Sequence, residues 1–179
     1  YNVFWFRRDL RLDDNVGFLA ALKSNNNVLP IFIFDSQILS NLSKDDARVT
    51  FIHNTLQKMR KELQEEWNSS LAIYYGKPTE VFKELLEKHT IEAVFTNRDY
   101  EPYAKERDEQ IRILLEKENI AFETFKDQVI FEKSEVVKSD GDPYVVYTPY
   151  KNKWKEAFDS EEHLEIHYTN SYLNNLIEN

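Results

Sequence analysis

The chain has 179 residues, of which 41% are hydrophobic, and this is enough apolar material for the core of one domain. Its formal net charge of −9 disfavours independent nucleic-acid binding, because that activity needs a basic surface. The absence of cysteine excludes disulfides and thiol chemistry, and the three glycines, Gly17, Gly76 and Gly141, are too scattered for a phosphate-cradling loop.

Metal and membrane roles find no support in the sequence. Of the four histidines only His163 and His167 have a helical i,i+4 spacing, and near a polar terminus we expect them to be solvated. The longest strongly apolar run, Val28 to Phe34, is too short to span a bilayer. No signal peptide is visible, so we expect a cytoplasmic protein that binds neither metal nor membrane.

Apolar strands alternate with amphipathic helices along the first 125 residues. We expect strands at 2–6, 28–34, 71–75, 91–96 and 120–125. The intervening helices are predicted after Asn15, over 46–67, after Pro78 and over 103–119. This βα alternation predicts an α/β fold with a parallel sheet and helices on both faces.

The pattern changes after residue 125. Residues 136–146 favour a hairpin around Ser139-Asp140-Gly141-Asp142. A helix is expected to start at Thr148-Pro149 and to carry Tyr150, Trp154 and Phe158 on one stripe. Residues 159–179 are polar and weakly patterned. We therefore expect one domain over 1–158 and the start of an interdomain linker over 159–179.

Two charged loops follow predicted strand ends, at Arg7–Asp14 and at Asn97–Pro102. If the strand order is 3-2-1-4-5, both loops lie at the switch point where parallel sheets bind ligands, and Asp35 joins their rim. One interpretation is a pocket for a polar aromatic ligand. The alternative, that these charges only pair with one another and cap helices, is favoured by the residue pattern alone. The sequence shows no nucleophile–base constellation that would indicate catalysis.

The opening Trp5-Phe6-Arg7-Arg8-Asp9-Leu10-Arg11-Leu12, followed by Asp14-Asn15, resembles the N-terminal signature of the DNA photolyase/cryptochrome family. Later segments agree in order and spacing, so that the resemblance covers residues 2–158. These segments are Val28–Asp35, Arg48 with Phe51-Ile52, Tyr75–Pro78, Asn97-x-Asp99-Tyr100-Glu101-Pro102 with Arg107-Asp108, and Gly141–Tyr150 with Trp154.

The resemblance implies a Rossmann-like five-stranded domain that precedes a larger helical domain, which binds FAD, receives damaged DNA and performs the repair. That helical domain is absent from this sequence, so the chain is expected to be an antenna domain without catalytic residues. The antenna of the family is a methenyltetrahydrofolate, an 8-hydroxy-5-deazaflavin or a second flavin. The implied contact residues are Arg8, Asp9, Leu10, Phe34, Asp35, Arg48, Ile52, Asn97, Asp99 and Glu101.

Three functions stay open at this point. The leading one is the light-harvesting domain of a deoxyribodipyrimidine photolyase, which repairs cyclobutane pyrimidine dimers. The second is the same domain of a cryptochrome-type blue-light receptor. The third is a nucleotide-binding α/β module with affinity for ATP or AMP, against which the scarcity of glycine counts. Some family members carry no antenna, and in such a member the charged loops only brace one another.

Overall fold

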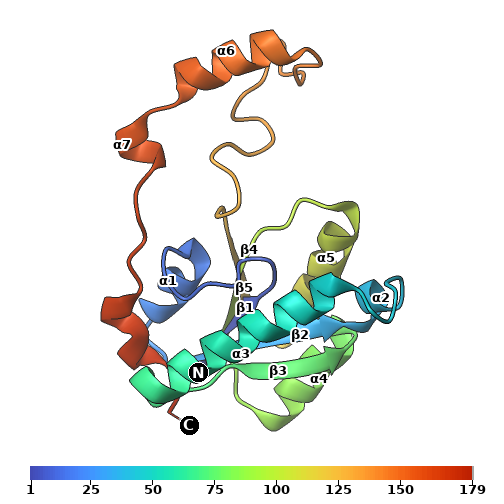
Figure 1. Cartoon of the computed structure of the whole chain (residues 1–179), viewed down its shortest axis with the longest axis vertical. Helices are drawn as coiled ribbons and strands as arrows, with labels where there is room; N and C mark the ends of the chain where they lie inside the picture. Colours follow the sequence, from blue (N-terminus) through green and yellow to red (C-terminus); the bar gives the residue numbers. More distant parts are fainter. Residues whose placement is uncertain (179) are drawn as a thin grey trace.

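The predicted parallel sheet is present in the computed structural model, which describes residues 1–178 (Figure 1). Its five strands are hydrogen-bonded in the order β3-β2-β1-β4-β5, and every pairing is parallel. The strands are β1 (Asn2–Phe6), β2 (Val28–Asp35), β3 (Ala72–Gly76), β4 (Ala93–Asn97) and β5 (Ala121–Phe125). The expected strand order 3-2-1-4-5 is thereby confirmed.

Helices cover both faces of the sheet. They are α1 (Val16–Leu22), α2 (Ser36–Leu39), α3 (Ala47–Trp67), α4 (Pro78–Lys88) and α5 (Pro102–Lys117). Side chains of α1 and α3 join one apolar cluster, and side chains of α4 and α5 join a second cluster on the opposite face. The architecture is a Rossmann-like three-layer α/β domain.

Strand β1 lies at the centre, and this explains its run of apolar residues. Phe4 and Phe6 belong to the cluster with α1 and α3, whereas Val3 and Trp5 belong to the cluster with α4 and α5. Successive side chains of a strand point to opposite faces, so a central strand covered on both sides must be apolar throughout. All five residues of β1 are buried.

Three predicted helix starts are confirmed, whereas the helix predicted from Thr148-Pro149 begins at Tyr147, with Val146 as its N-cap and no side-chain capping bond. The side-chain oxygen of Asn15 accepts a hydrogen bond from the Phe18 amide and caps α1. Asp46 caps α3 through the Arg48 amide, and Pro78 occupies the first turn of α4.

The segment after β5 leaves the sheet and then returns to it (Figure 1). The expected hairpin forms only its turn: the Gly141 amide donates to the Lys138 carbonyl at 2.9 Å, and no strand flanks it within the described residues. An isolated two-stranded ribbon without a packed face is only marginally stable, which accounts for the difference. Helices α6 (Tyr147–Ala157) and α7 (Ser160–His163) follow. We call residues 137–166 the arm and residues 1–126 the body.

Residues 167–178, within the predicted linker, pack on the body. The 3₁₀ helix η1 (Asn170–Asn175) places Leu173 in the apolar cluster beside α1, and Leu176 is buried next to it. The Ile177 amide donates to the Val28 carbonyl at 3.0 Å, which ties the segment to β2. Asn179, the last residue of the predicted linker, lies outside the described residues.

Candidate functional site

The strand order reverses between β1 and β4. From β1 the chain moves outward to β2 and β3, and β4 then pairs with the other side of β1, with Asn2 opposite Ala93. The loops that follow β1 and β4 therefore lie side by side at the carboxyl edge of the sheet. In open α/β sheets this switch point is where ligands bind.

The side chain of Arg7 is only 7% exposed and connects three elements beneath the sheet edge. Its Nη1 donates to Asp108 Oδ2 at 2.7 Å, and its Nη2 donates to the Asn97 carbonyl. The Arg7 guanidinium carbon lies 5.2 Å from the ring centroid of Trp5, and that of Arg107 lies 4.9 Å from it. Burial lowers the pKa of Arg7, and the Asp108 carboxylate opposes that shift. Arg107 also donates to Asp108, through Nε and Nη2. The guanidiniums of Arg7 and Arg107 are thus held by the same carboxylate, that of Asp108, and by the same indole, that of Trp5.

Arg8 reaches across the switch point and is half exposed. Its Nε lies 3.1 Å from Asp99 Oδ2, and its Nη2 lies 2.7 Å from Glu101 Oε1. The hydrogen bond to Glu101 and the charge of Asp99 raise the pKa of Arg8. Arg8 and Asp99 line both of two neighbouring cavities, and Glu101 lines one of them.

The first cavity has a volume of about 210 Å³ and is largely apolar. Its lining combines apolar side chains from β2, α2 and α3 with charged side chains from the loops after β1 and β4 and from α5. Its lining includes Phe34, Ile38, Leu39, Ile52, Arg8, Asp35, Asp99, Glu101, Tyr103 and Arg107. We call it the apolar cavity.

Asp35 is held in place at the edge of the apolar cavity. Its Oδ2 accepts a hydrogen bond from the Tyr103 hydroxyl at 2.6 Å, and its Oδ1 accepts one from the Gln37 amide at 3.0 Å. Burial and the hydrogen bond to Asp35 raise the pKa of Tyr103 well above its usual range. The tyrosine hydroxyl therefore stays a donor at every physiological pH.

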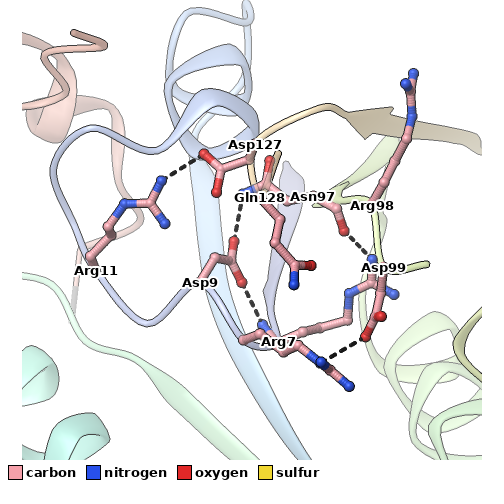
Figure 2. Close-up of a pocket in the computed structure, with 9 residues that line it drawn as sticks. Arg7, Asp9, Arg11, Asn97, Arg98, Asp99, Asp127 and Gln128 are labelled. Carbon is pink, nitrogen blue, oxygen red and sulfur yellow. Dashed lines mark hydrogen bonds and ion pairs between the residues drawn. The ribbon is translucent and has the colours of Figure 1, made fainter. Parts of the chain in front are cut away.

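The second cavity, of about 320 Å³, is lined by polar side chains and shares Arg7, Arg8 and Asp99 with the first (Figure 2). Asp127 lies at its far side with an almost fully buried carboxylate. Its Oδ1 accepts from Arg11 Nη2 at 2.7 Å and from the Val16 amide at 3.0 Å, at the start of α1. We call this second space the polar cavity.

The structure brings most of the predicted contact residues together. Arg8, Phe34, Asp35, Ile52, Asp99 and Glu101 line the apolar cavity, and Asp9 and Asn97 line the polar cavity. Two predicted residues lie elsewhere. Leu10 packs against the apolar core, and Arg48 turns to Asp46, with its side chain 71% exposed and outside both cavities.

Several lining residues were not expected from the sequence, among them Ile38, Leu39, Tyr103, Arg107, Asp127 and Gln128. Asp127 and Gln128 follow the fifth strand. The rule that ligands bind at the carboxyl ends of parallel strands, which pointed to the other two loops, also applies to them. Tyr103 and Arg107 are four residues apart on α5, and their shared face is a second signal that was missed.

The arrangement is suited to binding rather than to bond chemistry. An apolar slot with charged side chains at its rim can hold a planar heterocycle and satisfy its polar edge. Within residues 1–178, no group of three or more His, Cys, Asp or Glu side chains is placed to hold a metal ion. None of the helices described here is both long and apolar enough to cross a membrane.

Residues 2–167 match the sequence model of a family described as DNA photolyase. A deoxyribodipyrimidine photo-lyase of Synechococcus sp. is 33% identical over 153 residues, which cover 86% of this chain and 31% of that protein. Cryptochrome-1 of Drosophila melanogaster is 32% identical over 145 residues, which cover 78% of this chain and 27% of that protein. The chain thus spans about a third of the length of these relatives.

Solved structures agree with the sequence relatives. A class III photolyase from Agrobacterium tumefaciens superposes with a TM-score of 0.81 at 26% identity, over 99% of this chain and 35% of that chain. A photolyase from Sulfolobus tokodaii, solved with two FAD molecules, gives a TM-score of 0.68 at 35% identity, over 74% of this chain and 30% of that chain.

Proposed function

Because the chain belongs to the DNA photolyase family, we propose that its α/β domain holds the light-harvesting chromophore of a deoxyribodipyrimidine photolyase. The observation that carries the proposal is the apolar cavity at the switch point, with Arg8, Asp99 and Glu101 at its rim. A neighbour of this fold has been solved with two FAD molecules, which supports a flavin-type ligand in addition to the catalytic one.

The lining residues fit a planar heterocycle. Phe34 and Ile52 offer apolar surface for the ring faces, while the exposed carboxylate of Glu101 can accept an N–H from the ring edge. The Tyr103 hydroxyl donates its hydrogen bond to the Asp35 carboxylate, so both residues can line the cavity without leaving a buried polar group unpaired. The bound chromophore would supply light absorption and pass its excitation energy to the FAD of the helical domain, while the residues here bind it and exclude water.

Repair itself belongs to the whole protein in this proposal. FAD and the damaged DNA are assigned to the helical domain, and this chain contributes no catalytic residue. The arm supports such a partner, because it keeps apolar side chains at its surface: Val145 is 94% exposed and Tyr147 is 73% exposed. We propose that the arm faces the helical domain of the same protein.

A cryptochrome-type receptor is the second candidate, and the likeness to a cryptochrome favours it. The two functions differ in the activity of the full-length protein under blue light. Loss of cyclobutane pyrimidine dimers from irradiated DNA supports the photolyase. A protein that binds FAD and leaves the dimers intact supports the receptor.

The antenna proposal is tested by the absorption spectrum of the purified full-length protein and by titration with FMN, 8-hydroxy-5-deazaflavin and methenyltetrahydrofolate. We expect one probe to bind, and Ile52→Trp to weaken that binding at least tenfold because the larger side chain fills the cavity. Phe51→Trp is the matched control, since Phe51 is 69% exposed and does not line the cavity. Absence of any second chromophore, together with no binding of the three probes, would overturn the proposal.

A further inference from the structure

A buried amide, that of Asn97, lies at the point where β1, α1 and β4 meet. Asn97 Nδ2 donates to Asp9 Oδ2 at 2.6 Å and to Asn15 Oδ1 at 2.8 Å, and Asn97 Oδ1 accepts from the Gly17 amide at 2.9 Å. Both amide hydrogens and the amide oxygen of Asn97 are therefore engaged inside the protein. Asn97 is 5% exposed, and we call it with Asp9 and Asn15 the polar knot.

Within the polar knot, Asp9 is the residue that also bonds to the backbone next to Arg8. Its Oδ1 accepts from the Arg7 amide at 2.9 Å, and its Oδ2 accepts from both Asn97 and Asn15. Figure 2 shows Asp9 between Arg7 and Asn97, bonded to both. The residues on either side of Arg8 are thus fixed, so that its side chain starts from a defined point.

The fit around the Asn97 amide is tight. A Cβ atom on Gly17 would lie 2.5 Å from Asn97 Oδ1 and 3.1 Å from the Phe4 ring, so only glycine fits there without displacement. The start of α1 is therefore seated directly on the amide. A side chain at Gly17 must therefore shift either Asn97 or the start of α1 that packs on it, and both shifts disturb the hydrogen bonds of Asn97.

We propose that Asn97 and Asp9 are positioning residues of the chromophore cavity and not contacts of the chromophore. They hold the Arg7–Asp9 turn so that Arg8 reaches Asp99 and Glu101 and lines both cavities. This inference rests on the proposed antenna function. It differs from the sequence-based expectation, in which both residues touch the ligand.

The experiment exchanges the donor and the acceptor of the knot in the full-length protein. Asn97→Asp places a second carboxylate against Asp9, and the pair can share a hydrogen bond only when one of the two is protonated. The double variant Asp9→Asn/Asn97→Asp restores one donor and one acceptor between positions 9 and 97, while the hydrogen bonds of Asn15 to the side chains of these two residues are lost. The charged groups that surround the pair in the same cavity are Arg7, Arg8, Arg11, Arg98, Asp99 and Asp127, and they are unchanged in every variant.

The first measurement needs no ligand. Hydrogen exchange of residues 7–15 at neutral pH should be at least tenfold faster in Asn97→Asp than in the wild type, and at least threefold slower in the double variant than in Asn97→Asp. Unchanged exchange in Asn97→Asp would show that the knot does not hold the turn, and this overturns the inference while leaving the antenna function untouched.

The second measurement is the affinity for the probe that the wild type binds, at pH 8 and at pH 5.5. Asn97→Asp should lose at least tenfold in affinity at pH 8 and recover at pH 5.5, whereas the double variant should bind more tightly than Asn97→Asp at pH 8 and equally well at both pH values. Gly17→Ala disturbs the hydrogen bonds of the same amide without adding a carboxylate, so its loss of affinity should not depend on pH. A merely structural defect would show no such pH profile.

The outcomes separate the two proposals. If the double variant slows exchange relative to Asn97→Asp but does not regain affinity, Asp9 and Asn97 touch the ligand directly, and only the positioning role is overturned. If the wild type binds none of the three probes, the antenna function falls and the positioning of a chromophore cavity falls with it.

Discussion

The body and the arm differ in how far their aromatic side chains are buried. In the body, Trp5 is 2% exposed, packs edge-on against Phe82 and contacts the guanidiniums of Arg7 and Arg107 through its ring. In the arm, α6 buries no residue completely, and its Trp154 stacks on Phe158 at a centroid distance of 5.0 Å. The core of the body is closed, with Leu173 and Leu176 from the segment after the arm, whereas the arm presents aromatic surface that its own residues do not cover.

The largest difference in stability is expected between alanine variants of Trp5 and Trp154. Trp5→Ala should lower the free energy of unfolding by about 3–5 kcal/mol, because it leaves a cavity in the core. Trp154→Ala should cost about 1 kcal/mol or less, because the arm is loosely packed. Urea unfolding of this chain measures both, and equal losses would contradict the distinction between body and arm.

The segment after the arm provides an intermediate test. Leu176 is 3% exposed within the core of the body, so Leu176→Ala should cost about 2–3 kcal/mol. Leu164, in the arm, is 58% exposed, and Leu164→Ala should change stability by less than about 0.5 kcal/mol. If the loss at Leu176 is as small as that at Leu164, residues 167–178 do not belong to the folded body.

The smallest effect is expected at the edge of the apolar cavity. Unfolded tyrosine loses its proton near pH 10, whereas burial and Asp35 raise the pKa of Tyr103 in the folded chain. The raised pKa means that the protonated Tyr103 hydroxyl favours the folded chain. Its contribution to the free energy of unfolding is complete below pH 10 and is lost as the pH rises from there toward the folded pKa.

Tyr103→Phe should therefore cost about 1 kcal/mol at pH 8 and flatten the fall in stability above pH 10. Urea midpoints between pH 8 and pH 11 provide the measurement. Tyr147→Phe in the arm is the control, because Tyr147 is 73% exposed and should show no loss at pH 8. An unaltered alkaline profile in Tyr103→Phe would argue against the hydrogen bond to Asp35.

The fold could be predicted because its signals are local. The apolar run of β1, the cap at Asn15 and the proline at the start of α4 each report on a few neighbouring residues. Placing the charged loops at one edge needed only the strand order. The hairpin prediction failed because turn residues specify a turn, while flanking strands need a surface to pack on.

The pairing of charges could not be predicted, because each charged residue had several possible partners. Arg7 pairs with Asp108, a hundred residues away, and Arg11 pairs with Asp127. Arg48 was expected at the site, yet it pairs with Asp46 two residues before it. Leu173 and Leu176 lie in a segment that is mostly polar, and its few aliphatic residues show no sustained periodicity that would indicate burial.

The arm is also a closed loop, because both of its ends are fixed to the body. Before it, Glu132 pairs with Arg98 at 2.7 Å, and after it the Thr169 amide donates to Asp13 at 3.0 Å. The chain entropy lost on closing a loop grows only slowly with its length, so that doubling the arm would cost only about 0.6 kcal/mol. Insertions and deletions in the arm are therefore nearly neutral for the body. Evolution can remodel the surface that the arm presents without disturbing the cavities at the sheet edge.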